Sequence, residues 1–259
     1  MVLKVPVLLS HAVRAIPPPG LERWTTAPDE FRQHMDVISA SGRVPLTISE
    51  LAACLRGERR LESDAVAVTF DDGYADTHDA VRELLRRGIS STVYVTSGSI
   101  GDPGMLSAAE LQELVGLDGV EIGAHGVSHL HLDELARTAL GAEVGGSKRT
   151  LEAMAGCPVR SFAYPHGAHD RWTRQAVIGA GFTSACAVKN AISHLDDDPF
   201  AIARWTVTAD TTADRIGEVL RGERVLLARG GERVRTRAYR ALRRTRRQLR
   251  GRLPRGQRS

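Results

Sequence analysis

The sequence predicts an α/β protein whose parallel strands close into a (β/α) barrel. Two observations support this fold class. Apolar runs of strand length alternate with segments of helical periodicity, and the alternation continues through one span without a linker rich in proline or glycine. The 259 residues are enough for one domain of this kind. Six to eight strand–helix units fit a barrel better than an open sheet, which is the alternative.

Strands are expected where short apolar runs end at polar residues. The first run, "VPVLLS", follows a single lysine, and the run "AVAVTF" is followed by two aspartates. Because helical segments separate these runs, neighbouring strands should pair in parallel, with the helices outside. The predicted strands are 5–10, 65–70, 91–97, 120–125, 160–165, 183–188 and 201–207.

Helices are expected between these strands, and several carry start or stop signals. Pro28 and Gly42 delimit the first helix, and Ser107 with Glu110 forms a capping box at the start of the fourth. The glycine pair at 145–146 is expected to loosen the long fifth helix. The predicted helices are 28–42, 47–57, 75–88, 107–116, 133–155, 169–181 and 213–221.

Composition excludes several classes of protein. The three cysteines are scattered and no CxxC pair occurs, so neither a disulfide framework nor a cysteine zinc site is indicated. The start, "MVLKVPVLLSHAV", is better interpreted as a first strand than as a secretory signal, and no run approaches the length of a transmembrane helix. We therefore expect a cytoplasmic enzyme or binding protein.

Charge divides the chain into two parts. The net charge is +4, yet residues 233–259 carry twelve arginines and no acidic residue, so the rest of the chain is net acidic. We predict a barrel domain at 1–222 and a basic tail at 223–259, partly helical or disordered. The tail is first interpreted as a solvated segment; the alternative is electrostatic docking to an anionic surface such as the inner membrane face. No specific nucleic-acid binding is predicted.

Polar residues gather at one edge of the predicted barrel. In such barrels the active site lies at the carboxyl ends of the strands. His11 follows the first predicted strand, and Asp71 and Asp72 follow the strand at 65–70. His125 closes "VEIGAH", and His166 lies in "YPHG" at the end of the strand at 160–165. We expect these side chains to share one site.

Two of these groups indicate a metal. Adjacent carboxylates repel each other and are costly to bury unpaired, and a bound cation would compensate Asp71 and Asp72. His125 and His129 have the spacing that brings two imidazoles together, and two histidines with one carboxylate suit catalytic zinc. Gly73 permits a turn that lets both carboxylates face the barrel mouth, one as ligand and one as base. Taken singly, each motif also fits capping aspartates or surface histidines.

With these motifs the chain resembles the polysaccharide deacetylase family, also called carbohydrate esterase family 4 or the nodulation-factor deacetylase-like group. The resemblance runs from about residue 5 to 220 and is carried by TFDDG at 69–73 and HGVSH at 125–129. It implies a distorted (β/α)7 barrel that hydrolyses N-acetyl or O-acetyl groups on sugars.

The resemblance also implies roles for individual residues. Asp72, His125 and His129 would hold a divalent metal, with zinc expected first and nickel, cobalt or manganese as alternatives. Asp71 would be the general base that takes a proton from the attacking water. The metal would polarise that water and the acetyl carbonyl.

Two parts of the family pattern are missing. The arginine of the third motif is absent from "FAYPHG", so Arg204 in "IARWTV" is the candidate for orienting Asp71. The backbone N–H of His166 is the candidate oxyanion donor, because that role needs no particular side chain. The histidine of the last motif is not found, so His11 is the candidate proton donor, with His166 and His169 as alternatives.

We therefore predict a metal-dependent hydrolase that removes an N-acetyl group from a sugar and releases acetate. The expected substrate is a small molecule, glycolipid or oligosaccharide that contains an acetamido sugar. Two other functions stay open: hydrolysis of a non-sugar C–N amide bond on the same scaffold, and non-catalytic carbohydrate binding. The intact aspartate and histidine motifs argue against the last.

Overall fold

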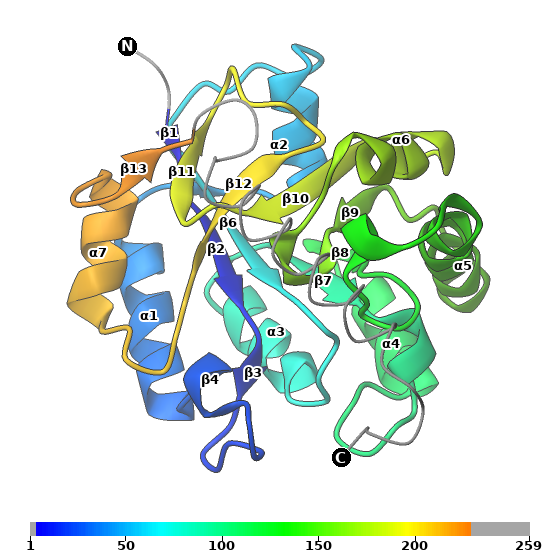
Figure 1. The fold of residues 1–259 in the computed structure, drawn as a ribbon. Coiled ribbons are helices and arrows are strands. Elements are labelled where there is room, and N and C mark those ends of the chain that lie inside the picture. Colours follow the sequence, from blue (N-terminus) through cyan, green and yellow to red (C-terminus); the bar gives the residue numbers. More distant parts are fainter. Residues whose placement is uncertain (1–3, 229–259) are drawn as a thin grey trace, which may run out of the picture. The chain divides into compact units, whose positions relative to one another are not determined.

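A closed parallel barrel forms the centre of the molecule (Figure 1). The computed structural model describes residues 4–228. Within this part of the chain, seven strands pair in parallel, and the first of them pairs with both the second and the last, which closes the sheet. The barrel strands are β2 (Val7–Ser10), β6 (Ala65–Phe70), β7 (Ser91–Val95), β8 (Val120–Ala124), β9 (Ser161–Ala163), β10 (Ser184–Val188) and β12 (Ile202–Thr206). The predicted (β/α)7 barrel is confirmed.

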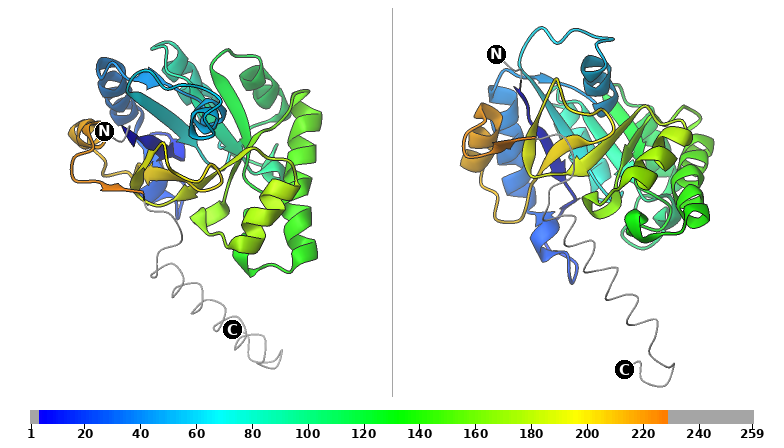
Figure 2. Two further views of the ribbon diagram at one scale, coloured as in Figure 1. Left: turned by 90° about the horizontal axis from the view of Figure 1, so that it is seen from above. Right: turned by 45° about the horizontal axis from the view of Figure 1, so that its top comes forward.

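Seven helices of the described residues surround the barrel (Figure 2). The capping box predicted at Ser107 and Glu110 is present, and Thr47 with Glu50 forms a second one. The glycine pair at 145–146 does not loosen the fifth helix, which is continuous from Arg137 to Ala155. The helices are α1 (Pro28–Ala40), α2 (Ile48–Leu55), α3 (Thr77–Leu85), α4 (Ala108–Val115), α5 (Arg137–Ala155), α6 (Arg171–Gly179) and α7 (Ala213–Arg221).

Several short strands outside the barrel were not predicted. A small sheet joins β1 (Lys4–Val5), β11 (Ala191–His194) and β13 (Leu226–Leu227), while β3 (Ala12–Val13) pairs with β4 (Thr25–Thr26) and β5 (Val44–Pro45) pairs with β6. Because β13 pairs with β11, the compact unit runs through Ala228. Residues 223–228 of the predicted basic tail at 223–259 are therefore part of this unit, and residues 229–259 lie outside the described residues. Within residues 4–228 no helix is both long and apolar enough to cross a membrane.

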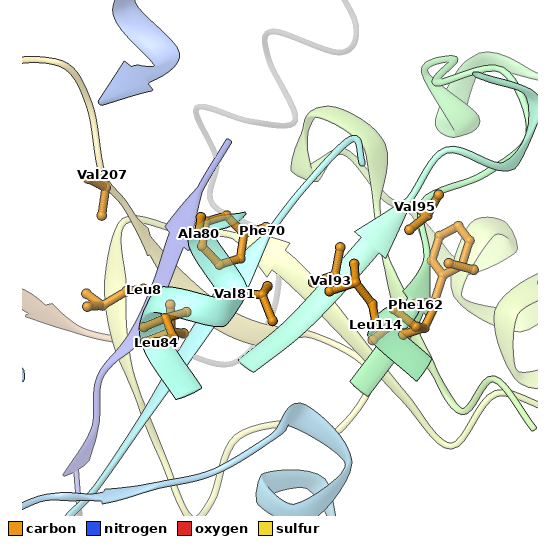
Figure 3. Close-up of a cluster of buried hydrophobic side chains, with 14 of the residues drawn as sticks. Leu8, Phe70, Ala80, Val81, Leu84, Val93, Val95, Leu114, Phe162 and Val207 are labelled. Carbon is orange, nitrogen blue, oxygen red and sulfur yellow. The ribbon is translucent and has the colours of Figure 1, made fainter. Parts of the chain in front are cut away.

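The main core lies between the barrel and its helices. On β6 the alternate residues Val66, Val68 and Phe70 join this cluster. Figure 3 shows Phe70 beside side chains of α3 and of neighbouring strands. Alternation along a strand therefore turns Ala67 and Thr69 toward the inside of the barrel. A second apolar cluster, which includes Ala67 and Ala163, occupies part of the interior, and the carboxyl-end opening is left for polar chemistry.

Candidate active site

A cavity of about 610 Å³ opens at the carboxyl ends of the barrel strands. Its walls combine apolar side chains, such as Leu21 and Met105, with a few polar and titratable ones, which is the usual character of a small-molecule site. Polar residues that follow five of the strands line it: His11, Asp71, Asp72, Thr96, His125 and His166. The structure thus brings together the predicted site residues at the expected edge.

Asp72 lies at the centre of this cavity because the chain turns sharply after β6. Its φ of 76° and the 83° of Gly73 are both in the left-handed region, which a glycine adopts easily and an aspartate only occasionally. The turn brings Asp72 Oδ1 to 3.2 Å from Nε2 of His129 and 3.5 Å from Nε2 of His125. This oxygen is buried and has no hydrogen-bond partner in the described structure.

His125 presents one defined nitrogen to Asp72. Its Nδ1 lies 2.8 Å from the carbonyl oxygen of Ala163 at the end of β9, and a carbonyl can only accept, so Nδ1 carries the proton. In the neutral ring Nε2, which faces Asp72, is then the nitrogen that has the lone pair. A hydrogen bond from one ring nitrogen to a carbonyl is the common way to orient a metal-binding histidine.

His129 completes a group of three ligand atoms. One ligand atom each from Asp72, His125 and His129 lies within 4.8 Å of the others. Burial, followed by the charge that His125 can carry, lowers the pKa of His129, which favours the neutral imidazole near pH 7. Two nitrogen lone pairs and a carboxylate facing one another repel unless a cation lies between them. The donor set and the unpartnered oxygen of Asp72 therefore fit a divalent metal.

Asp71 is stabilised differently, by an arginine on β12, a strand that β2 alone separates from β6. Both of its oxygens accept from Arg204 on β12, with Nη1–Oδ1 at 2.6 Å and Nη2–Oδ2 at 2.7 Å. Arg204 is fully buried and also contacts Thr69 and the face of Tyr94. Burial alone would raise the pKa of Asp71, but the Arg204 guanidinium and His125 bring it down to about 2. The predicted pairing of Arg204 with Asp71 is present.

Below this pair the barrel interior is hydrogen-bonded. The hydroxyl group of Tyr94 lies 2.6 Å from the Ser161 hydroxyl and 3.3 Å from the Cys186 thiol. Burial is the main cause of the raised pKa of the Cys186 thiol, about 11. The thiol therefore stays protonated and acts as a packed polar group rather than a nucleophile. This layer supports Arg204 from beneath.

His11 and His166 lie on two sides of the cavity. His11 faces Trp24, with ring centres 5.3 Å apart, and its Nδ1 is buried without a hydrogen-bond partner in the described part of the chain. Burial lowers the pKa of His11, whereas the charges of Asp71 and Asp72 act in the opposite direction. This histidine therefore has a free nitrogen and anionic neighbours within the site.

His166 lies among other histidines. Its ring stacks on His131 at 3.8 Å and meets His129 edge-on at 4.4 Å. Burial, and then the charge that His129 can carry, lower the pKa of His166 to about 4. Its backbone is left-handed, with φ of 58°. His169, the other alternative, stacks on Tyr164 at 4.4 Å and does not line the cavity.

Some lining residues could not be found from the sequence. Tyr74 follows the aspartate motif by two positions, which is a usable signal, and burial with the Asp72 charge raises its pKa so that the hydroxyl stays protonated. Trp24 comes from the short helix η1 (Glu22–Trp24), and Met105 from a loop after β7. Their positions depend on the paths of long connections, for which the sequence carries no local signal.

Comparison with known proteins agrees with this architecture. The sequence profile of the polysaccharide deacetylase family matches residues 58–185. A Bacillus subtilis protein assigned to the polysaccharide deacetylases, YxkH, is 25% identical over 215 residues, which are 83% of this chain and 75% of that protein. Over these residues the chain is similar to the polysaccharide deacetylase family.

Solved structures confirm the fold. Streptococcus pyogenes deacetylase PplD in complex with acetate has a TM-score of 0.77 at 20% identity, covering 86% of this chain and 99% of that one. The polysaccharide deacetylase BC0361 from Bacillus cereus has a TM-score of 0.75 at 24% identity, covering 85% and 69%. IcaB from Ammonifex degensii has a TM-score of 0.74 at 23% identity, covering 84% and 97%. These similarities concern the barrel.

Proposed function

We propose that this chain is a metal-dependent hydrolase that removes the N-acetyl group from an acetamido sugar and releases acetate. Its similarity to the polysaccharide deacetylases supports the assignment as a carbohydrate deacetylase. The single observation that carries the metal-dependent proposal is the convergence of Asp72, His125 and His129 beside the Asp71–Arg204 pair in one cavity. A non-catalytic carbohydrate-binding protein would have no need to keep these charged groups together.

Asp72, His125 and His129 would hold the metal, which would lower the pKa of a bound water and polarise the acetyl carbonyl. Asp71 would accept the proton of the attacking water. Its pKa of about 2 keeps it ionised throughout the neutral range, and the two bonds to Arg204 fix its orientation. Asp71 is therefore a weak but permanently available and well-oriented base.

The other two roles fall to residues on the cavity wall. His11 would donate a proton to the leaving amine, because its Nδ1 is unpartnered in the described structure and the charges of Asp71 and Asp72 oppose the lowering of its pKa by burial. The backbone N–H of His166 would stabilise the negative charge that develops on the acetyl carbonyl oxygen when water attacks the carbonyl carbon. Trp24, with Leu21 and Met105, offers an apolar wall for the C–H face of a sugar ring.

Metal analysis combined with acetate release tests the proposal. Full-length protein is stripped with a chelator, reloaded separately with zinc, nickel, cobalt and manganese, and assayed on acetamido sugars, O-acetyl sugars and non-sugar acetamides. We expect one metal per chain and acetate release from the acetamido sugars only. Turnover of non-sugar amides alone would favour the alternative hydrolase, and stoichiometric sugar binding without metal or turnover would favour the binding protein. A cytoplasmic location and a docking role for 233–259 stay predictions.

A further inference from the structure

The loop between the two metal-site histidines is held by an acidic residue of another element. Residues 126–128 connect His125 to His129. The amide N–H groups of Val127 and Ser128 both donate to Oε2 of Glu143 on α5, at 3.0 and 2.9 Å. Two donors converge on one carboxylate oxygen, and hydrogen bonds to an ionised acceptor are stronger than neutral ones.

The other side of the same loop is held by the segment after β7. The carbonyl oxygens of Gly126 and Val127 accept from the amides of Ser97 and Gly98, at 3.1 and 2.9 Å. These backbone groups of the connecting loop thus bond to two separate elements. Only the bonds to Glu143 depend on a side chain, so a single substitution there can release one side of the loop.

Close packing brings α5 to the loop. A Cβ atom at Gly146, one helical turn beyond Glu143, would lie 3.2 Å from Cγ2 of Val127. A Cβ atom at Gly126, whose φ is 79°, would lie 3.4 Å from Glu143 Oε2. Glycine at these two positions allows the helix and the loop to approach, and Glu143 occupies the space next to the missing side chain of Gly126.

His129 is the ligand that most needs this support. Its side chain is 35% exposed, against 2% for His125 and 15% for Asp72. Its φ of 52° is uncommon for a residue other than glycine and persists only where the surroundings enforce it. His125 has its own hydrogen bond to Ala163, whereas the direction of His129 follows from the path of the loop before it.

We propose that Glu143 is a positioning residue, which sets His129 for metal binding by fixing the backbone of residues 127 and 128. Glu143 acts through the loop and is not itself a metal ligand. The proposal rests on the proposed metal site. It predicts that removing the carboxylate weakens metal binding by about 10- to 100-fold, the usual effect of losing a group that orients a metal ligand.

The test compares three variants of the full-length chain. Glu143→Ala removes the acceptor, and Glu143→Gln keeps an acceptor oxygen without the charge. Glu152→Ala is the matched control, because Glu152 lies on the same helix and also accepts a backbone N–H, from Val159 at 3.0 Å. Zinc affinity is measured by competition with a chromophoric chelator, and ligand geometry by the visible absorption of the cobalt-substituted protein.

We expect Glu143→Ala to bind zinc 10- to 100-fold more weakly and to change the cobalt spectrum, with Glu143→Gln in between and Glu152→Ala like the wild type. If wild-type protein binds metal and both Glu143 variants match Glu152→Ala in affinity and spectrum, the positioning role is wrong and the proposed function stands. If wild-type protein binds no metal, the metal-dependent function is wrong and this role falls with it. Should Glu143→Ala not fold, Glu143→Gln decides.

Discussion

Asp71 and Asp72 are neighbours in the chain, but the protein treats their carboxylates in opposite ways. Asp71 faces the barrel interior, where Arg204 binds both of its oxygens and a hydrogen-bonded layer lies beneath. Asp72 faces the mouth, where one buried oxygen has no partner in the described structure and two imidazoles approach it. In the interior, Arg204 balances the charge of Asp71. At the mouth, no group of the described chain balances the charge of Asp72, which can therefore attract a cation.

This difference separates two functions of acidic groups. A carboxylate that is fully paired inside the protein is oriented and permanently ionised, which suits a proton acceptor. A carboxylate that is held in place but unpaired attracts a cation. In the proposed mechanism the same pair of residues supplies both a base and a ligand. Variants at the mouth should change metal binding, and variants at the interior should change turnover or stability.

The largest effect is expected at the mouth. His125→Ala removes the ligand nitrogen that the Ala163 carbonyl orients, so stoichiometric metal and acetate release should both disappear. Metal content by elemental analysis and acetate release measure the two losses. Circular dichroism serves as the folding control. Full metal occupancy in a folded His125→Ala protein would show that this histidine is not a ligand.

Asp71→Asn should separate the two carboxylates. The asparagine cannot accept the water's proton, so kcat should fall by about 10²- to 10⁴-fold, while metal content stays at one per chain. Asp72→Asn is the companion variant and should lose metal. The opposite pattern, with metal lost in Asp71→Asn and activity surviving in Asp72→Asn, would exchange the two roles.

Arg204→Met should affect stability most. It leaves Asp71 buried without its partner, so we expect the free energy of unfolding to fall by about 3–5 kcal/mol at neutral pH, measured by urea denaturation of metal-free protein. Arg174→Met is the control. Arg174 also makes two bonds to one aspartate, Asp198, but this pair is well exposed and should contribute about 1 kcal/mol or less.

The pH dependence of this pair has a definite sign. In the wild type the depressed pKa of Asp71, about 2 against an ordinary 3.8, contributes stability that is present above pH 3.8 and is lost as pH falls toward 2. In Arg204→Met, burial without the guanidinium raises the pKa of Asp71. Acidification then protonates Asp71 and removes the unpaired buried charge that destabilises the variant. The stability difference between the two proteins should therefore narrow on acidification; a constant difference would show that Asp71 is not the group involved.

The smallest of these effects is expected for His11→Ala, which removes the candidate proton donor. We expect kcat to fall by about 10²-fold with the metal retained, and the limb of the pH–rate profile that reports the acid to change. His11→Gln, which keeps a polar group facing Trp24, controls for packing. An unchanged rate and pH profile in both variants would transfer the donor role to His166.

How far the sequence could predict the site depends on how local each signal is. The adjacent aspartates and the HGVSH spacing are short motifs, and each lies at the end of a predicted strand. Because the carboxyl ends of parallel strands lie at the same edge of the barrel, the two motifs come together there. Arg204 was inferred because the expected arginine is absent from "FAYPHG", and it reaches Asp71 because β2 alone separates β12 from β6. Glu143 lies in a helical segment whose sequence gives no sign of the loop it contacts, and Trp24 depends on the path of a long connection.

The fold shows the same limit. The barrel strands are buried apolar runs and were predicted almost to their ends, as with 65–70 against Ala65–Phe70. The short strand β11 is stabilised by pairing with segments far away in the chain, β1 and β13, so no local pattern marks it. α5 is likewise continuous through Gly145 and Gly146, and the close approach of Gly146 to Val127 is a tertiary contact that the sequence alone does not reveal.

The double pairing of β2 has a consequence for how the protein is assembled. This strand is the seam of the barrel: Leu8 and Leu9 pair with Trp205 and Thr206 of β12, whereas Val7–Ser10 also pair with β6. Closing the seam joins segments from opposite ends of the described chain, so loop-closure entropy opposes it more than any nearer strand pairing. His11 directly follows one strand of the seam and Arg204 lies on the other. A chain that has not yet closed its barrel therefore has two open strand edges and, for the same reason, has not assembled the proposed catalytic residues.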